Sequence, residues 1–370
     1  MRPLKWLVRM IVRLVAIILL IPILGFAYGW LTTADQPPAP RSQAAPAAIA
    51  AQLREGIPGY QRPEESTFLT YPEWAIVYAA RDYAAFVAGR SESDFPYVAY
   101  IGRFWQDYAI VVRATAGYPF NAQNHLMLVV IGTSHTIEHG LQWAWENTIG
   151  RLTEWSADGG KTAQDVYLAA TAAEYAAFLD QVPWYRFPYA RKRAELWRIP
   201  VAEGRAGIRA WERRLAFGLS YTIKQAYADL IASGLEATSE AAQSQIYVWA
   251  QGPVTDAIRG EPDTALEREF DADGTVFVTK RYQAFTELLP RLVDKGLRFV
   301  EIGGNQNVLL TVLSTEPPMT PPGVRQLFSH ALPADPSRLR TGFIVPVSSL
   351  HEVLPMLDSR GDRLEHVYDY

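Results

Sequence analysis

Cysteine is absent from this chain of 370 residues. Its absence excludes a disulfide framework, a thiolate nucleophile, and any zinc or iron–sulfur site that uses cysteine ligands. The sequence also contains no phosphate-binding glycine loop and no G-x-S-x-G elbow, the motifs of P-loop nucleotide hydrolases and of α/β-hydrolases. Without disulfides the fold depends on its hydrophobic core, and a chain of this length can bury one.

A basic surface is also missing from most of the chain. The net charge is -4, and the first thirty residues carry four bases and no acid, so the other 340 residues carry -8. An acidic body repels phosphate backbones, and no basic stripe interleaved with aromatic residues occurs, so we expect no nucleic acid partner. With 49% hydrophobic and 20% charged residues, the chain has the composition of a folded protein.

One long apolar run stands near the start of the chain. Leu14–Trp30 contains no charged residue. If Arg13 extends toward the headgroups, a helix from Met10 to Trp30 has the roughly 20 residues that cross ~30 Å of hydrocarbon. Tyr28 and Trp30 stand where interfacial aromatic residues are common. Residues 1–30 are therefore predicted to be a transmembrane anchor.

The basic residues before this run predict its orientation. Bases stay on the cytoplasmic side, so the N-terminus is expected in the cytoplasm and the body outside the membrane. The alternative is a cleaved signal peptide with a small-residue site at Gly25–Ala27, which exports the body as well. Residues 31–62 are rich in alanine and proline, and we interpret them as a tether with a short helix at Ala47–Arg54.

Aromatic residues mark the next part of the chain. Nine of the eleven tryptophans lie between Trp74 and Trp249, and none follows. Apolar residues at helical spacing predict a helix bundle over residues 63–255. Its five helices begin at Pro72, at Asp94, at Asn121 (ending at Gly150), at a Thr162–Asp165 capping box, and at Ile208. One side of the fifth helix carries Trp211, Leu215, Leu219, Ile223, Tyr227 and Leu230, and aromatic residues at this spacing indicate a side that packs in the core.

After Gly274 the apolar pattern becomes alternating. It predicts strands at 275–281, 298–302, 342–347 and 364–370, helices at 283–295 and 350–359, and a hairpin whose turn is Gly303–Gln306. Glu287–Gly296 and Glu352–Gly361 are similar in sequence and lie 65 residues apart. Two such βαβ units form a ferredoxin-like, split-βαβ domain, predicted here over residues 270–370. The expected fold class is α+β: an N-terminal transmembrane helix, an aromatic-rich helical bundle, and a ferredoxin-like domain.

The sharpest chemical motif is H-x-x-E-H, formed by His135, Glu138 and His139. On a helix the two histidines lie one turn apart and could share a zinc ion, with Glu138 as the catalytic base. Over about nine residues the motif resembles the inverted zincin metallopeptidases. A zinc site needs a third protein ligand, and the candidates are Glu146, Glu174 and Glu212. The alternative interpretation is that the three residues make hydrogen bonds inside the bundle.

A broader resemblance is carried by three segments. TYPEW (Thr70–Trp74), FPYVAYIGRFW (Phe95–Trp105) and TIGRLTEW (Thr148–Trp155) resemble an uncharacterised family of bacterial membrane-anchored proteins. The resemblance implies a single-pass protein of the bacterial inner membrane with a periplasmic body, and it implies no activity. In that family Glu138 matches, whereas an aromatic residue occupies the place of His139.

Two functions follow from these observations. The first is a binding or assembly module for an apolar ligand or a protein partner, because the aromatic residues could line a pocket. The second is a metal-dependent hydrolase that uses the H-x-x-E-H residues. Charges embedded among apolar residues should be paired or form a site: Glu73, Arg81, Asp82, Arg103 and Glu138. Asp271–Gly274 resembles the start of a calcium loop, but we interpret it as a turn before a strand.

Overall fold

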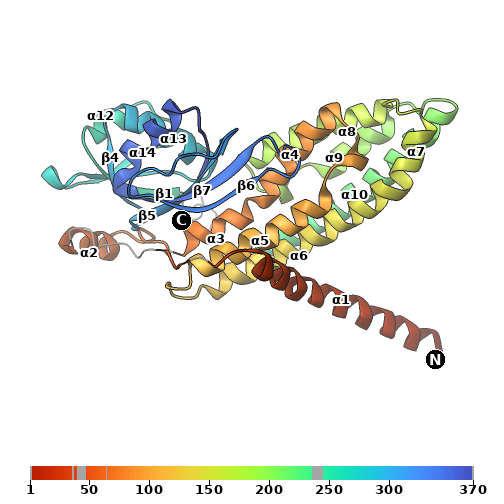
Figure 1. Cartoon of the computed structure of the whole chain (residues 1–370), viewed down its shortest axis with the longest axis horizontal. Coiled ribbons are helices and arrows are strands. Elements are labelled where there is room, and N and C mark those ends of the chain that lie inside the picture. The colour runs from red at the N-terminus through yellow and green to blue at the C-terminus, as the bar shows by residue number, and fades with distance from the viewer. Residues whose placement is uncertain (1, 36, 40–46, 64, 236–244, 369–370) are drawn as a thin grey trace. The chain divides into compact units, whose positions relative to one another are not determined.

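The computed structural model describes residues 2–35, 37–39, 47–63, 65–235 and 245–368. The protein is a mixed helical and sheet structure, with helices up to Leu235 and two antiparallel sheets after it (Figure 1). Two compact units divide the chain. The sheet unit comprises residues 1–74, 101–137 and 241–370, and the helical unit comprises residues 75–100 and 138–240.

Ten α-helices precede the first strand in the described residues. They are α1 (Arg2–Thr32), α2 (Ala47–Gly56), α3 (Ser66–Glu73), α4 (Ala75–Gly89), α5 (Tyr97–Ala114), α6 (Ala122–Trp145), α7 (Arg151–Ser156), α8 (Ala163–Leu179), α9 (Tyr189–Arg198) and α10 (Arg205–Leu235).

Helix α1 contains the predicted apolar segment. Val15–Thr32 is long and apolar enough to cross a membrane, and only 6% of this window is buried within the protein. Such a helix near the N-terminus fits both a membrane anchor and a signal sequence, the two alternatives that the sequence left open.

Two of the predicted helix starts are confirmed and two are wrong. Thr162 and Asp165 form the predicted capping box at the start of α8, and the Asn121 side chain accepts a hydrogen bond from the Asn124 amide at 3.2 Å. The prediction for Pro72 is wrong, since this residue lies inside α3, after which α4 begins at Ala75. Asp94 lies in a 3-10 turn before α5 rather than at its cap.

Two further predictions about the helices are wrong. The helix expected to end at Gly150 continues through a π-helical turn, Glu146–Gly150, into α7. The face of α10 expected in the core is exposed, with Leu215 57% and Leu219 63% accessible. The opposite side of α10, which carries Arg209, Glu212 and Arg213, is buried instead.

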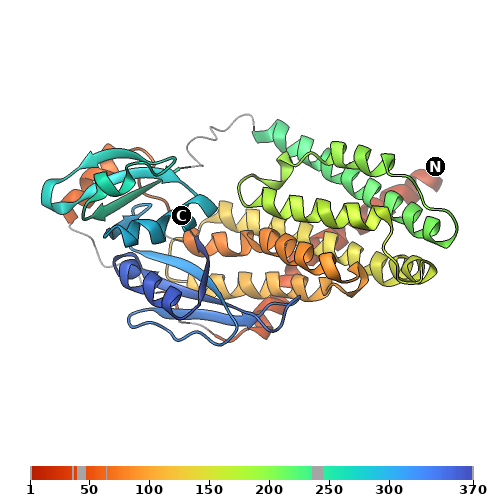
Figure 2. The same cartoon turned by 90° about the horizontal axis from the view of Figure 1, so that it is seen from above.

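The C-terminal part of the chain forms two four-stranded antiparallel sheets (Figure 2). The first has strand order β2-β3-β1-β4, and the second has the order β6-β7-β5-β8. The strands are β1 (Gln245–Gln251), β2 (Ala265–Glu269), β3 (Thr275–Lys280), β4 (Arg298–Ile302), β5 (Asn307–Ser314), β6 (Arg325–Ala331), β7 (Leu339–Pro346) and β8 (Arg363–Tyr368); the helices are α12 (Val254–Ile258), α13 (Gln283–Asp294) and α14 (Leu350–Ser359).

One hydrophobic core joins the two sheets and their helices. Val248 of β1 pairs with Phe277 of β3 and with Ile302 of β4, while Leu310 of β5 pairs with Phe343 of β7. All five side chains are 0% exposed and belong to the same buried cluster, to which α13 and α14 also contribute. Removing this apolar surface from water is the main driving force for the fold of this part of the chain.

The predicted hairpin around Gly303–Gln306 is wrong. Strand β4 pairs with β1, and β5 pairs with β7 and β8, so the turn connects two different sheets. The similar segments lie on two helices that connect strands of different sheets: Glu287–Gly296 on α13, between β3 and β4, and Glu352–Gly361 on α14, between β7 and β8. The prediction failed because β1, which precedes residue 270, was assigned to the helical part of the sequence, and because strand pairing depends on contacts distant in the chain. The predicted end of the last strand, Tyr370, lies outside the described residues.

Part of the predicted tether is packed against the first sheet. Leu53 of α2 is 0% exposed and belongs to a buried cluster with Trp249 and Val276. The Tyr60 hydroxyl donates a hydrogen bond to the buried Glu301 at 2.9 Å, and Arg54 pairs with the same carboxylate at 3.2 Å. Apolar residues at helical spacing in α2 explain this packing, because they give the helix one buried face.

Candidate functional site

The H-x-x-E-H motif lies on α6, with its residues in different surroundings. In the sheet unit, His135 is 5% exposed, and its ring centroid lies 5.8 Å from that of Phe104. In the helical unit, the His139 ring lies 6.0 Å from the ring of Tyr97. Glu138 forms an ion pair with Lys224 of α10 at 2.6 Å.

This arrangement does not assemble a metal-ligand set. Among residues 2–35, 37–39, 47–63, 65–235 and 245–368, no group of three or more histidine and acidic side chains could hold a metal ion. The three candidate third ligands are bound elsewhere in the helical unit: Glu146 to Arg213, Glu174 to Lys192, and Glu212 to Arg213. The zinc site remains a prediction from the motif.

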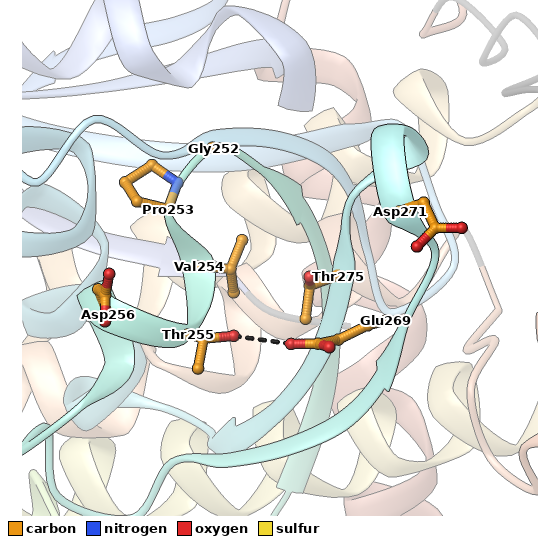
Figure 3. A pocket seen from close by; sticks show the side chains of 8 residues that line it. All are labelled: Gly252, Pro253, Val254, Thr255, Asp256, Glu269, Asp271 and Thr275. Atoms are coloured by element: carbon orange, nitrogen blue, oxygen red, sulfur yellow. Dashed lines mark hydrogen bonds between the residues drawn. The ribbon is translucent and has the colours of Figure 1, made fainter.

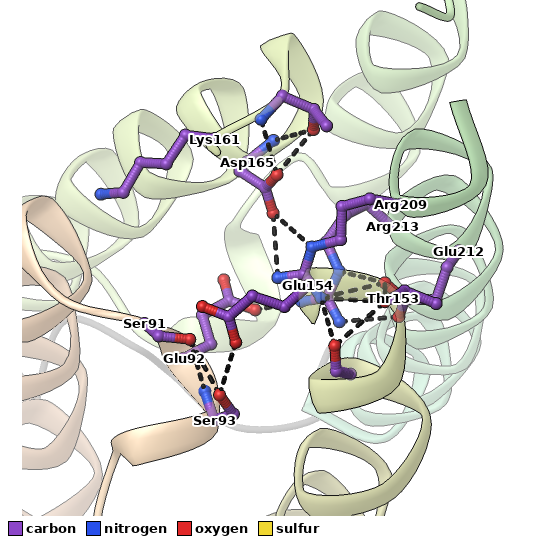
Figure 4. Close-up of polar contacts among 12 residues, drawn as sticks. Ser91, Glu92, Ser93, Thr153, Glu154, Lys161, Asp165, Arg209, Glu212 and Arg213 are labelled. Atoms are coloured by element: carbon purple, nitrogen blue, oxygen red, sulfur yellow. Dashed lines mark hydrogen bonds and ion pairs between the residues drawn. The ribbon is translucent and has the colours of Figure 1, made fainter. Parts of the chain in front are cut away.

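The most developed polar feature of the helical unit is a buried ionic network, which the sequence analysis missed (Figure 4). Arg213 of α10 is 0% exposed. Its guanidinium pairs with Glu92, with Glu146 at 2.9 Å and with Glu212 at 2.6 Å. These carboxylates come from the 3-10 turn before α5, from the π turn after α6, and from α10 itself. The network therefore ties three segments together.

A second arginine extends this network to α8. Arg209 donates hydrogen bonds to Asp165 Oδ1 at 3.1 Å and to the Gly150 carbonyl oxygen at 3.0 Å. The other carboxylate oxygen of Asp165, Oδ2, accepts hydrogen bonds from the amide and hydroxyl of Thr162 at the start of α8. Breaking a buried pair by removing one partner costs about 3–5 kcal/mol, because the other charge stays buried and uncompensated. We conclude that this network fixes the helices of the unit.

The spacing of three charged residues in the sequence indicates the network. Arg209, Glu212 and Arg213 have the i, i+3, i+4 spacing that places them on one side of a helix. This side is the buried one: the exposed fractions of these three residues are 5%, 7% and 0%. Two of the charges that lie among apolar residues in the sequence also have polar partners: Arg81 pairs with Asp180 at 2.6 Å, and Asp82 accepts a hydrogen bond from Tyr100.

The outer side of α10 is apolar, so the polarity of this helix is inverted. Between the exposed residues Arg205 and Asp229, no exposed residue of α10 is charged. The exposed large side chains in this interval are Ile208, Trp211, Leu215, Leu219, Ile223 and Tyr227. At a rise of ~1.5 Å per residue, they extend over about 29 Å along the helix.

The sheet unit has a small polar pocket of about 290 Å³ next to α12 (Figure 3). Thr255 in its wall donates a hydrogen bond to Glu269 at 2.9 Å, and Asp256 and Asp271 add two more carboxylates. Asp271–Asp273 form a 3-10 turn before Gly274 and β3, as the turn interpretation predicted. The acidic lining disfavours an anionic ligand, and no further chemistry follows from this geometry.

Comparisons with known proteins do not identify the chain. No known protein family, no curated protein and no solved structure matches it.

Proposed function

We propose that this protein is a membrane-attached binding module whose helical unit binds lipid hydrocarbon through the outer face of α10. The observation that carries the proposal is the inverted polarity of this helix. Arg209, Glu212 and Arg213 face the interior, while Leu215 and Leu219 face outward. In a water-soluble bundle the apolar side of a helix faces the core.

An exposed apolar face of this size is unfavourable in water. Burying one large aliphatic or aromatic side chain contributes about 1.5–3 kcal/mol relative to leaving it exposed. Contiguous exposed apolar surfaces mark sites that bind a protein, a ligand or a membrane. The outer face of α10 therefore needs an apolar partner.

Lipid is the partner that fits the dimensions of the face. The interval from Ile208 to Tyr227 has no exposed charge and is about 29 Å long, close to the ~30 Å thickness of a bilayer's hydrocarbon core. Trp211 and Tyr227 lie near its two ends, where interfacial aromatic residues are common. Helix α1 would keep the chain at a membrane, where this partner is always present.

The proposal includes a location and a finer description of the fold. We place α1 as an uncleaved anchor in a bacterial inner membrane with its N-terminus in the cytoplasm; the basic residues Arg9 and Arg13 support this orientation. We assign a ferredoxin-like topology to each sheet. The support is that the first and third strands, β1 and β3 in one sheet and β5 and β7 in the other, lie in the centre.

The absence of cysteine makes the lipid contact easy to test. Leu219→Cys, made in the full chain, carries the only thiol and can be labelled with bimane in phosphatidylethanolamine/phosphatidylglycerol vesicles. Glu203→Cys, at an exposed position just before α10, is the matched control. We expect brominated phospholipid to quench the bimane at position 219, and aqueous iodide to quench it at position 203.

Two results would contradict the proposal. Equal quenching by iodide at both positions would show that the α10 face lies in water. Formation of disulfide-linked dimers by Leu219→Cys, without quenching by brominated lipid, would show that a second copy of the chain covers the face.

A further inference from the structure

Helix α1 makes a close contact with α5 inside the sheet unit. Gly25 and Gly29 lie one helical turn apart and face Trp105 of α5. A Cβ atom at Gly29 would overlap the backbone carbonyl of Trp105, and one at Gly25 would overlap its indole ring. Pairs of small residues with this spacing allow two helices to approach closely, a packing mode common between helices in membranes.

The contact continues along both helices. The Phe26 ring lies 5.5 Å from the ring of Tyr108, and the guanidinium of Arg113 lies 3.8 Å from the centre of the Trp30 ring. Arg113 also donates a hydrogen bond to the Trp30 carbonyl oxygen at 2.6 Å. Because the partners advance along the two chains together, α5 runs in the same direction as α1.

Residues 122–137 of α6, the part of this helix in the sheet unit, lie against the same stretch of α5. Trp105 Nε1 donates a hydrogen bond to the Thr136 hydroxyl at 3.0 Å, and the Tyr108 hydroxyl is hydrogen-bonded to His125 at 3.0 Å. The outward side of this part of α6 is apolar and exposed, at Leu126, Met127 and Val130.

Charged residues on these two helices are kept away from solvent. Between residues 101 and 137 the only residues of the types Asp, Glu, Lys and Arg are Arg103, Asp107 and Arg113, and none of them is exposed. Asp107 accepts a hydrogen bond from the Tyr71 hydroxyl at 3.0 Å, and Arg113 lies over Trp30. Polar groups inside a bilayer need such internal partners, since lipid tails offer none.

The position of the contact along α1 gives its depth in the membrane. Gly25 lies ten residues after Val15, the start of the membrane-crossing window Val15–Thr32. At ~1.5 Å per residue the contact with Trp105 lies about 15 Å from the Val15 end of the window and about 10 Å from the Thr32 end, inside hydrocarbon that is ~30 Å thick. A helix packed there cannot stay in water while α1 crosses the hydrocarbon. Arg113 and Trp30 meet at the other end of the contact, where residues of these types mark the membrane surface.

We infer that α5 and residues 122–137 of α6 enter the bilayer beside α1, so that α1 crosses the membrane packed against two further helices and not as a single anchor. The inference rests on contacts within the sheet unit and does not depend on the proposed lipid contact of α10. Lipid hydrocarbon is the occupant assigned to the outward face of α6 at Leu126, Met127 and Val130.

Single cysteines in the full chain test this inference in phosphatidylethanolamine/phosphatidylglycerol vesicles. Val130→Cys reports on the outward side of α6, and Glu287→Cys, on the exposed side of α13, is the control. We expect brominated phospholipid to quench bimane at position 130, and a membrane-impermeant maleimide to react at least tenfold more slowly there than at position 287. Equal reaction rates at the two positions would overturn the inference.

A second pair of variants tests whether α1 holds the other two helices in place. Gly29→Leu fills the contact with α5, whereas Ala27→Leu makes the same enlargement at an exposed position of α1. Both variants should stay in the membrane during carbonate extraction, and only Gly29→Leu should lose the lipid quenching at position 130. Unchanged quenching in Gly29→Leu would show that α6 does not depend on α1. The Leu219→Cys measurement reads α10 separately, so failure of either proposal can be recognised by itself.

Discussion

Replacing Arg213 with methionine should strongly destabilise the helical unit. Arg213 is 0% exposed and is the common partner of Glu92, Glu146 and Glu212. Methionine retains most of the side-chain volume and leaves only a small cavity, so the dominant effect is the loss of the positive charge. Three carboxylates are then left together in the interior.

The size of the effect follows from this geometry. Removing one partner of a buried ion pair costs about 3–5 kcal/mol. For a unit of this size, a loss of 1 kcal/mol lowers the melting temperature by about 4 °C. We therefore expect Arg213→Met to lower the melting temperature of the helical unit by about 12–20 °C.

Tryptophan fluorescence during heating of the detergent-solubilised full chain measures this change. The matched control is Arg191→Met, because the Arg191 side chain is 62% exposed and its ion pair with Glu195 is 3.7 Å long. Exposed pairs contribute about 0–1 kcal/mol, so this variant should melt within about 4 °C of the original protein.

A compensating variant tests whether uncompensated carboxylate charge causes the loss of stability. Adding Glu92→Gln and Glu146→Gln to Arg213→Met removes two uncompensated charges and should restore part of the lost stability. If Arg213→Met melts like Arg191→Met, or if the added neutral residues lower stability further, the network does not hold the helices as we describe.

Two further predictions concern metal content and pH. Elemental analysis of the purified full chain should find no stoichiometric zinc, because the candidate third ligands Glu146, Glu174 and Glu212 are each paired with an arginine or a lysine; zinc that is lost in a His139→Ala variant would instead support the hydrolase interpretation. Burial, followed by the charges of Arg103 and Arg340, lowers the pKa of His330 well below its ordinary value of 6.5. The unfolded chain therefore binds a proton that the folded chain does not, so stability should fall as the pH decreases below 6.5. Melting curves between pH 5 and 8 should show this loss, and His330→Gln should reduce it; an equal slope in the variant would contradict the assignment.

The sequence predicted local features well. The long apolar helix, the Thr162–Asp165 cap, and the helix at Leu350–Ser359 depend on residues close together in the chain, and each appears near its predicted place. The strand at Arg298–Ile302 was also correctly bounded. Its pairing was not predicted, because its partner β1 lies about fifty residues earlier and looked like the end of a helical region.

The candidate site was less predictable for a related reason. Apolar spacing identified α10 as amphipathic, but spacing alone does not say which side faces inward. Apolar residues at this spacing were interpreted as core, whereas the structure exposes Leu215 and Leu219 and buries Arg209 and Arg213 instead. The H-x-x-E-H spacing was likewise real, but the partner of Glu138 is Lys224, more than eighty residues further along the chain.

Asp165 takes part both in a helix cap and in the buried ionic network. One of its oxygens closes the first turn of α8, while the other is the counter-ion of an arginine on α10. Loss of the ion pair with Arg209 would therefore also destabilise the first turn of α8. Because the cap and the network share one carboxylate, the start of α8 depends on the charges of residues that lie far away in the sequence.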